Sequence, residues 1–130
     1  MPEATYPDDL HYHDQHDWAR LEGDDHAVFG ITWYAQDSLG EVVFFDPPEV
    51  GTEVHKDSSY AEVESVKAVS DVIAPMSGEI VDVNDSLQDA PERINEDPYG
   101  EGWLVKVRLT SPQEAGALLG AAEYRKLLES

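Results

Sequence analysis

The sequence predicts a mainly β fold, either a β-sandwich or a small barrel, with short helices that include a helical element at the C-terminus. Short alternating strands recur along most of the chain, separated by Gly, Pro, Asn and Asp, the residues typical of turns. A weak internal repeat suggests two similar halves that fold on each other. At 130 residues the chain has the length of one domain.

The first third of the chain alternates strands with turn signals. We expect residues 1–15 to form a loosely ordered arm. The elements that follow are strands Asp17–Arg20 and His26–Ile31 around the turn residues 22–25, a helix Trp33–Leu39 between Thr32 and Gly40, and a strand Glu41–Asp46 before Pro47-Pro48.

The internal repeat consists of two segments with the same order of apolar and polar residues. Val50–Val54 and Val83–Leu87 both read apolar, turn residue, two polar residues, apolar. A polar loop and then a strand follow each segment, Tyr60–Val66 after the first and Trp103–Leu109 after the second. We expect Pro75–Gly78 to join the two halves.

The C-terminal segment, residues 111–130, has the pattern of two short helices packed on the sheet. Ser111 and Glu114 have the spacing of a capping box, and Pro112 occupies the first helical position. The apolar residues that would face the sheet are Leu118, Leu119, Tyr124, Leu127 and Leu128. We expect this element to close the fold and not to form an active site.

The composition excludes several classes of protein. Without cysteine the chain has no disulfide, no thiolate nucleophile and no thiolate metal ligand. The formal net charge of -20 excludes generic binding to nucleic acid, because the chain would repel phosphate. No apolar run has the length that spans a bilayer, and the N-terminus lacks the features of a signal peptide. We therefore expect a soluble, cytoplasmic protein without a membrane partner.

The acidic charge has two interpretations. An acidic surface steers a protein toward basic clefts on its partners, and dense carboxylates with few lysines also keep a protein hydrated in concentrated salt. The 28 acidic residues are spread along the whole chain and do not gather in a tail. This distribution favours the second interpretation, and we hypothesise a halophilic source.

Lys67 lies where an alternating strand pattern breaks, in a chain that has few lysines. Small or apolar residues alternate with acids over Ala61–Ser65, and Val72–Ala74 form a second apolar run. This pattern predicts a hairpin over residues 61–75 with its tip near Val66-Lys67-Ala68, although no Asn-Gly or Asp-Gly marks the turn. A lone lysine on a turn is ordinarily just a solvated side chain, but the residues around this one favour a more specific role.

The segment around Lys67 resembles the lipoyl-lysine site of the glycine cleavage system H-protein family. The matching residues are Glu64-Ser65-Val66-Lys67-Ala68, Ser70-Asp71 and Ala74-Pro75-x-Ser77-Gly78. The resemblance continues over most of the chain in His16-Asp17-Trp18, Gly30-Ile31-Thr32-x-x-Ala35-Gln36-x-x-Leu39-Gly40, Pro48-Glu49-Val50-Gly51 and Asn95–Trp103. The attachment motif alone fits lipoyl domains in general, and the other segments make the resemblance specific to the H protein.

This resemblance implies a lipoyl-domain-like hybrid of sandwich and barrel, built from two antiparallel sheets, with lipoate joined covalently to Lys67 by a lipoylating enzyme. It also implies a carrier and not an enzyme, with no catalytic residues. In the family, the dithiolane accepts the aminomethyl group of glycine from a pyridoxal-phosphate-dependent glycine decarboxylase (P protein). A tetrahydrofolate-dependent aminomethyltransferase (T protein) then receives the group, and dihydrolipoyl dehydrogenase (L protein) reoxidises the dithiol.

The chemistry of lysine agrees with such a role. Its primary amine ends a flexible stem and forms an amide when deprotonated. With an eight-carbon acyl chain attached, bond counting at backbone-like spacing gives a reach of more than roughly 10 Å. Val66 and Ala68 are small or apolar neighbours that keep the approach to Lys67 clear. Acylation removes the positive charge, so the role requires the amine and not its charge.

Four further residues belong to the site that the resemblance implies. Glu64 matches an acid that helps the lipoylating enzyme recognise its target, although it is also one acid among many in this chain. Asp17, Tyr34 and Asp71 lie at positions implied to contact the loaded arm when it folds back on the protein. Trp33-Tyr34 replaces a more polar pair found in many members of the family.

The sequence predicts no metal site. His11, His13 and His16 are the one cluster of metal-ligating side chains, and they lack a nearby complete set of ligands. We expect Trp18 to be a core residue. Asn95–Trp103 is dense in turn formers and is expected to be a structural connection whose surface can also contact partner enzymes.

Three other roles remain open. A biotin carrier has the same lysine on a hairpin, but its lysine usually lies between two methionines, where this chain has Val66 and Ala68. A lipoyl or octanoyl relay protein of lipoate metabolism would use Lys67 to pass its acyl arm to other lipoyl domains. An unmodified interaction module would not need the Lys67 amine. No Ser-His-Asp set, Walker lysine or Gly-rich phosphate loop indicates an enzyme.

Overall fold

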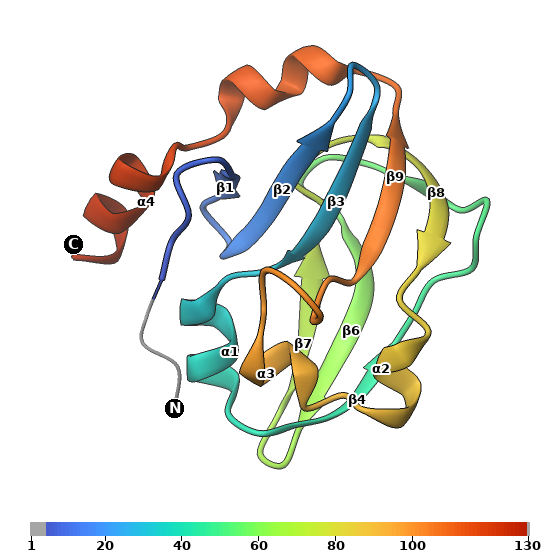
Figure 1. Cartoon of the computed structure of the whole chain (residues 1–130), viewed down its shortest axis with the longest axis vertical. Coiled ribbons are helices and arrows are strands. Elements are labelled where there is room, and N and C mark those ends of the chain that lie inside the picture. The colour runs from blue at the N-terminus through green and yellow to red at the C-terminus, as the bar shows by residue number, and fades with distance from the viewer. Residues whose placement is uncertain (1–4, 130) are drawn as a thin grey trace.

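The computed structural model describes residues 5–129, which form two antiparallel sheets and short helices (Figure 1). The strands are β1 (His11–His13), β2 (Asp17–Glu22), β3 (His26–Ile31), β4 (Val42–Asp46), β5 (Glu53–Val54), β6 (Ser59–Ser65), β7 (Val69–Ile73), β8 (Gly78–Val83) and β9 (Val105–Leu109). The helices are α1 (Trp33–Leu39), α2 (Ser86–Asp89), α3 (Arg93–Glu96), the 3-10 helix η1 (Pro112–Ala117) and α4 (Ala121–Leu128). The predicted fold class is confirmed. No helix within residues 5–129 is both long and apolar enough to cross a membrane.

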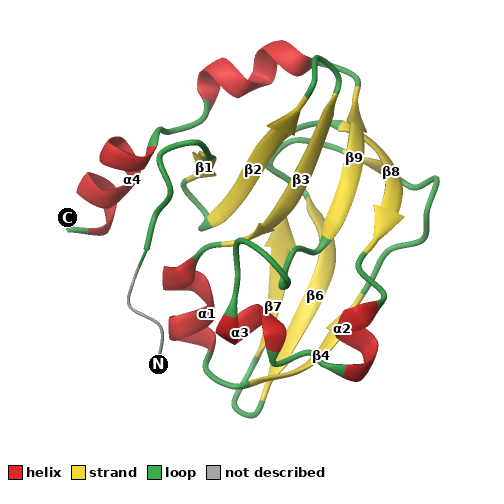
Figure 2. Cartoon of the chain, in the orientation of Figure 1, coloured by secondary structure: helices red, strands yellow, loops and turns green. Residues whose placement is uncertain are grey.

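The two sheets differ in size and in position. The larger has six strands in the order β1-β2-β3-β9-β8-β5, and the smaller has three in the order β4-β6-β7. Neighbouring strands run antiparallel in both. The smaller sheet extends past the larger one, so that the β6–β7 turn lies at the opposite end of the molecule from the β2–β3 turn (Figure 2).

Local signals correctly predicted several elements. β3 and α1 have the expected bounds. Thr32 Oγ1 accepts a hydrogen bond of 3.2 Å from the backbone N–H of Ala35 and so caps α1. Gly40 ends the helix at φ 85°, a conformation that glycine adopts without steric cost.

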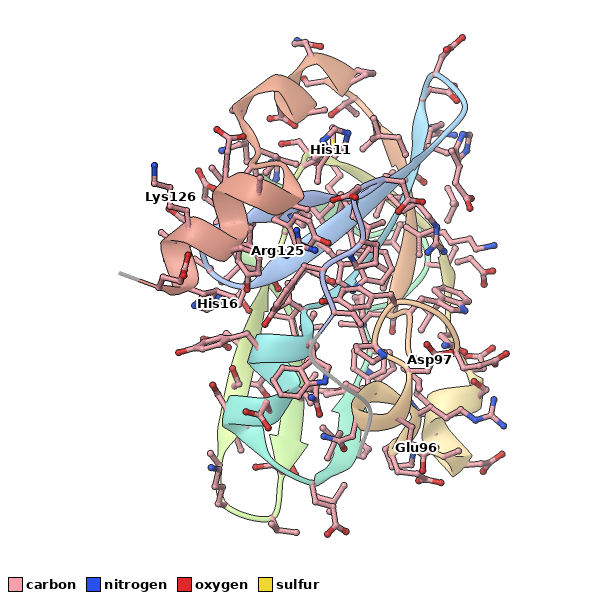
Figure 3. All side chains as sticks on the ribbon, turned by 60° about the vertical axis from the view of Figure 1, so that its left-hand side comes forward. His11, His16, Glu96, Asp97, Arg125 and Lys126 are labelled. Atoms are coloured by element: carbon pink, nitrogen blue, oxygen red, sulfur yellow. The ribbon has the colours of Figure 1, made fainter. Side chains whose placement is uncertain are left out.

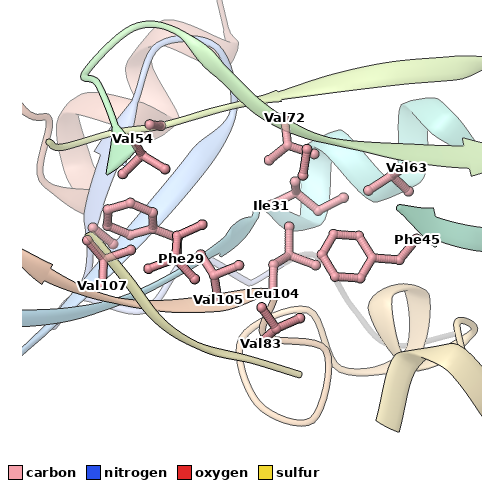
Figure 4. Packing of buried hydrophobic residues seen from close by; sticks show 14 of the residues in the cluster. Phe29, Ile31, Phe45, Val54, Val63, Val72, Val83, Leu104, Val105 and Val107 are labelled. Atoms are coloured by element: carbon pink, nitrogen blue, oxygen red, sulfur yellow. The ribbon is translucent and has the colours of Figure 1, made fainter. Parts of the chain in front are cut away.

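The main core fills the space between the two sheets. Figure 4 shows Phe29, Val105 and Val107 of the larger sheet facing Val63 and Val72 of the smaller one, and all five are buried. Burying one such side chain stabilises the fold by about 1.5–3 kcal/mol. Along β6 and β9 buried residues alternate with more exposed polar ones, as in other sheet-on-sheet packings, whereas β3 is buried on both faces.

A second apolar cluster covers the opposite face of the larger sheet, where α4 and the N-terminal segment pack. The rings of Tyr12 and Tyr124 stack there with their centroids 4.8 Å apart. Trp18 lies opposite Gly30 in the β2–β3 pair, and a Cβ on Gly30 would lie 2.5 Å from the indole ring. Only glycine leaves room for the ring at this position. Trp18 is fully buried, which confirms its expected place in the core.

The N-terminal segment is more ordered than the expected arm. Leu10, Tyr12 and His13 are buried, and β1 pairs with β2. Tyr12 and Leu119 exchange two backbone hydrogen bonds of 2.8 Å. The prediction of a loose arm is therefore wrong for this part, because its partner is the C-terminal segment and no local pattern reveals that contact. Residues 1–4 lie outside the described part of the chain.

The connection from β8 to β9 contains two short helices where a polar loop was expected. α2 and α3 each bury one apolar side chain, Leu87 and Ile94. The amide of Asn84 donates hydrogen bonds of 2.8 Å to the carbonyls of Glu101 and Trp103 and closes the connection. One buried residue in each helix is too weak a period to recognise in the sequence.

The C-terminal segment forms the two expected short helices, η1 and α4, but not the expected capping box. The side chain of Ser111 makes no capping hydrogen bond. Glu114 instead accepts hydrogen bonds from the backbone N–H and the hydroxyl of Ser77, at 2.7 and 3.0 Å. The carboxylate thereby fastens the C-terminal segment to the start of β8, a tertiary contact that outcompetes the local cap.

Candidate functional site

The β6–β7 hairpin carries Lys67 in its turn. β6 ends at Ser65 and β7 begins at Val69, which leaves Val66, Lys67 and Ala68 between the strands. All three turn residues are exposed. A backbone hydrogen bond of 2.8 Å from Ser65 N to Ala68 O closes the turn. The lysine is therefore presented at the tip of a short, closed hairpin.

The side chain of Ser65 explains how the turn forms without glycine. Ser65 Oγ accepts hydrogen bonds from the backbone N–H groups of Lys67 and Ala68, at 3.2 and 3.1 Å. Serine hydroxyls that bind nearby backbone in this way stabilise turns. Within residues 5–129 the non-glycine residues with positive φ are His16 and Asp57. The Lys67 turn thus contains no backbone conformation that requires glycine.

The Lys67 side chain lies over the end of α1. A Cβ on Gly40 would lie 3.5 Å from Lys67 Cε. The backbone N–H of Val66 donates a hydrogen bond of 3.1 Å to the carbonyl of Glu41, which follows α1. These contacts hold the hairpin tip against the connection between α1 and β4, while the side chain of Lys67 stays exposed.

An acidic hollow of about 450 Å³ opens beside this connection. Its lining includes four carboxylates, those of Asp37, Glu41, Glu92 and Glu96. Carboxylates gathered around a concave surface produce a local negative potential that attracts cationic groups. The side of the molecule next to Lys67 therefore carries a local concentration of negative charge.

Glu64 lies at the base of the hairpin tip. The strand register places it opposite Phe44 of β4 and opposite Val69 of β7. Glu64 is half-buried, and both apolar neighbours are exposed. A protein that reaches Lys67 from this side of the sheet would meet all three residues.

Asp17 begins β2 and is buried, with 2% of its surface exposed. The backbone N–H of Ile73, at the end of β7, donates a hydrogen bond to its carboxyl group. Oδ2 has no hydrogen-bond partner among the described residues. Burial raises the pKa of Asp17 well above its usual range, because a low-dielectric environment disfavours the charged form. A buried carboxyl with one unsatisfied oxygen is a candidate for function.

Tyr60 is a candidate site residue that sequence reasoning missed. Its hydroxyl is buried and, within residues 5–129, has no hydrogen-bond partner. Burial, and then the negative charge of Asp17, raise the pKa of Tyr60 well above its usual range. The Tyr60 hydroxyl and the Asp17 carboxyl therefore share one buried environment between β6 and β2. The only feature of the sequence that could have pointed to Tyr60 is the presence of a polar aromatic residue within an alternating strand.

Tyr34 lies in the first turn of α1 and is exposed. Its ring packs on that of His16, with the centroids 4.5 Å apart. His16 Nδ1 is 2.7 Å from the Tyr124 hydroxyl of α4, and Figure 3 shows His16 beside that helix. Burial lowers the pKa of His16. Tyr34 thus contacts His16, the residue that directly precedes Asp17 in the chain.

Asp71 is exposed in β7, opposite Glu62 and two residues before Ile73. β7 consequently connects the expected site residues, with the Lys67 turn at one end and the Ile73–Asp17 hydrogen bond at the other. At a strand rise of about 3.3 Å per residue, the distance from Val69 to Ile73 is about 13 Å.

The histidines at the N-terminal side have separate partners. His13 Nε2 lies 2.6 Å from Asp57 Oδ1, and Gln15 N donates a hydrogen bond of 3.0 Å to His13 Nδ1. His16 contacts Tyr124, as described above. In the described range 5–129 no group of three or more His, Cys, Asp or Glu residues is arranged to hold a metal ion.

The chain belongs to the class of two-sheet proteins that present an exposed lysine at the tip of a hairpin. Known proteins resemble it over nearly its whole length. A crystal structure of a glycine cleavage system H protein from Mycobacterium marinum matches with a TM-score of 0.87 at 43% identity, over 95% of this chain and 99% of that one. The sequence model for "Glycine cleavage H-protein" matches residues 10–130. The chain therefore belongs to the glycine cleavage H-protein family, which confirms the resemblance noted from the sequence.

Bacterial relatives give the same result. The glycine cleavage system H protein of Symbiobacterium thermophilum is 51% identical over 121 residues, which cover 93% of this chain and 94% of the relative. That of Rubrobacter xylanophilus is 52% identical over 126 residues, 97% of each chain. These matches extend over almost the full length of this chain and of each relative, so the similarity is not confined to the hairpin.

Proposed function

We propose that this protein is the lipoyl carrier of a glycine cleavage system and bears its lipoyl group on Lys67. It is not itself an enzyme on this proposal. It moves the aminomethyl group of glycine, in the cytoplasm, from a glycine decarboxylase (P protein) to an aminomethyltransferase (T protein), and dihydrolipoyl dehydrogenase (L protein) reoxidises it. The observation that carries the proposal is the exposed Lys67 at the tip of a closed hairpin, in a member of this family.

The local structure fits covalent attachment of lipoate at Lys67. Lys67 is exposed on a turn that Ser65 stabilises, its side chain extends over Gly40 at the end of α1, and it lies between two small or apolar residues, Val66 and Ala68. When attached, the lipoyl group supplies a dithiolane that cycles between disulfide and dithiol, which the cysteine-free chain cannot do itself. The role of the chain is to display, orient and shelter that group.

We infer that β7 is the track along which the arm folds back on the protein. The arm reaches more than roughly 10 Å from Lys67, and β7, which begins two residues after Lys67, is about 13 Å long from Val69 to Ile73. Asp17 lies at the far end of this track with an oxygen, Oδ2, that has no partner among the described residues. A primary amine that arrived there would donate a hydrogen bond to that oxygen. Asp71 and Tyr34 would contact the arm on the way.

The mass of the intact protein, isolated from its native cell, tests the attachment. We expect one population heavier than the sequence by a single lipoyl amide, and we expect Lys67→Arg to abolish the gain. Arginine keeps the positive charge but offers no amine that forms a stable amide. Lys56→Arg is the matched control, because Lys56 pairs with Asp57 and lies outside the hairpin.

The same measurement separates the alternatives. An unmodified Lys67 in a cell supplied with lipoate would contradict the carrier proposal and favour an unmodified interaction module. A gain that matches biotin would contradict it as well. Transfer of the acyl group from Lys67 to a second lipoyl domain, in the absence of glycine, would instead favour the relay protein.

A further inference from the structure

Tyr60 lies in a β-bulge of β6. Its neighbours Ser59 and Ala61 pair with adjacent residues of β7, so Tyr60 is an extra residue between them. The burial of β6 changes phase at this point, because Ala61 is buried and Ser59, two residues earlier, is exposed. A bulge re-aims the side chain that it carries, and the Tyr60 hydroxyl is buried.

The bulge directs Tyr60 to the face of the larger sheet that carries Asp17. The Tyr60 ring packs edge-on against Phe29 of β3, with the ring centroids 6.0 Å apart. Phe29 lies opposite Ala19, which is two residues after Asp17 in β2, so these three side chains share one face. From β7, Ile73 pairs with the residue before Tyr60 and donates its backbone N–H to the Asp17 carboxyl group. The two polar side chains therefore lie in one buried region.

Neither polar side chain has a partner there. Asp17 Oδ2 and the Tyr60 hydroxyl are two of the three buried side-chain polar atoms that lack a hydrogen-bond partner within residues 5–129. Burial, and then the charge of Asp17, raise the pKa of Tyr60, so the two groups lie within electrostatic range of each other. An unpaired buried polar group opposes folding. A ligand that donates hydrogen bonds to both oxygens would remove this cost.

The chemistry of the two oxygens selects the ligand. A carboxylate and a hydroxyl oxygen both accept hydrogen bonds, and a primary ammonium group carries three N–H donors and a positive charge. One such group satisfies Asp17 and Tyr60 together. A quaternary ammonium ion has the same charge but no N–H to donate. Ile31, directly opposite Asp17, and Phe29 are apolar and supply no competing partner.

We propose that the Tyr60 hydroxyl binds the amino group of the cargo together with Asp17. Asp17 Oδ2 and the hydroxyl oxygen form a two-oxygen site, here called the Asp17–Tyr60 site, at the end of β7 remote from the Lys67 turn. The inference rests on the proposed function and adds Tyr60 to it. Because both oxygens are buried, an amine held between them is sheltered from water.

The chain without a lipoyl group tests the Asp17–Tyr60 site directly. The probe is methylammonium chloride, and tetramethylammonium chloride at the same concentration is the control, because it screens the acidic surface without donating hydrogen bonds. We expect methylammonium to raise the melting temperature of wild type by about 2 °C or more beyond the control. Tyr60→Phe and Asp17→Asn should lose this difference. Equal melting temperatures of wild type in the two salts would overturn the inference.

The stability of the empty chain gives a second readout. Tyr60→Phe keeps the ring on Phe29 and removes only the unpaired hydroxyl, so its melting temperature should equal or exceed that of wild type. Tyr12→Phe is the matched control, because the Tyr12 hydroxyl already donates a hydrogen bond of 2.7 Å to the carbonyl of Pro7. Its melting temperature should fall by several degrees. An equal fall in Tyr60→Phe would show that the Tyr60 hydroxyl has a partner in the empty chain, contrary to the inference.

Retention of the cargo tests the role of Tyr60 in the carrier. The lipoylated chain is loaded from glycine by a purified glycine decarboxylase and then separated from it, and intact mass follows the loss of the aminomethyl group with time. We expect this loss to be about tenfold faster in Tyr60→Phe than in wild type, the effect of one missing hydrogen bond to a charged group. Tyr12→Phe should lose the group at the wild-type rate.

The outcomes separate this inference from the proposed function. If wild type takes up no lipoyl group, or no aminomethyl group once lipoylated, the proposed function fails and the cargo role of Tyr60 with it. If wild type is loaded and Tyr60→Phe retains the group equally long, only the inference fails. Faster loss in Tyr12→Phe as well would reduce the effect to general loosening of the fold and would also overturn it.

Discussion

The carboxyl group of Asp17 is enclosed between β2 and β7, whereas most acids of this chain lie in water. Its neighbours supply one backbone hydrogen bond, from Ile73, and leave Oδ2 without a partner among the described residues. Burial holds its pKa well above the usual range. In the proposed carrier this keeps a proton on the group until a cationic amine arrives to stabilise the ionised form.

The raised pKa of Asp17 predicts a specific dependence of stability on pH. Above pH of about 4 the unfolded chain releases the Asp17 proton while the folded chain still holds it. Protonated Asp17 therefore contributes its full stabilisation of the fold below that pH. This contribution is lost as the pH rises through the raised pKa of Asp17 in the folded state. Each pKa unit of difference is equivalent to about 1.4 kcal/mol.

Chemical denaturation of Asp17→Asn between pH 4 and 7 measures this effect. Relative to wild type, we expect the free energy of unfolding of the variant to increase with pH by at least about 1 kcal/mol, because asparagine never ionises. Asp8→Asn, at an exposed position, is the control and should follow wild type at every pH. Parallel curves for wild type and Asp17→Asn would show that Asp17 ionises normally in the fold.

At the scale of the element, the β6–β7 hairpin depends on a side chain as much as on its strands. Ser65 Oγ accepts hydrogen bonds from the backbone N–H groups of Lys67 and Ala68. The hydrogen bond from Val66 to Glu41 ties the turn to the end of α1. Together with the backbone hydrogen bond from Ser65 N to Ala68 O, these contacts place the lysine without a turn residue that requires glycine.

Removing the Ser65 hydroxyl should loosen the turn without unfolding the protein. Ser65→Ala leaves two backbone N–H groups without their acceptor, which costs about 1 kcal/mol. We expect the melting temperature to fall by roughly 3–5 °C and amide hydrogen exchange at Lys67 and Ala68 to accelerate. Ser70→Ala, an exposed serine in the same hairpin, should leave both quantities unchanged. Undisturbed exchange in Ser65→Ala would mean that the strands alone hold the turn.

At the scale of the whole molecule, a net charge of -20 is distributed over a small two-sheet fold. Asp46, Glu62 and Asp71 form an acidic row across the three strands of the smaller sheet, and Glu53 lies opposite Glu79 in the larger one, where Arg108 pairs with Glu79. Such repulsion opposes the compact state and is reduced when salt screens it. The halophilic source that we hypothesise from the composition would supply that screening.

Thermal melts at low salt and at molar salt test this hypothesis. The screening length falls from about 10 Å at 0.1 M to about 3 Å at 1 M, so we expect the melting temperature to rise by several degrees over that range. The variant Glu62→Gln, with one charge fewer in the acidic row, should gain less from added salt than wild type. Equal melting temperatures at both salt concentrations would remove the basis for a halophilic interpretation.

The sequence by itself determined those features that depend on neighbours in the chain. Alternation of apolar residues with polar ones predicted most strands, Thr32 and Gly40 set the bounds of α1, and the interrupted alternation around Lys67 marked the hairpin. These signals are local, because strand period, caps and turns involve residues a few positions apart.

Only the tertiary structure decided which distant residues meet. The N-terminal segment pairs with Leu119, and Glu114 binds Ser77 instead of capping a helix. Asp17 is buried beside Ile73 and Tyr60. The same holds for the alignment of Phe44, Glu64 and Val69 on one face. Such contacts depend on strand pairing and sheet packing across the fold, and no periodicity within a single segment encodes them.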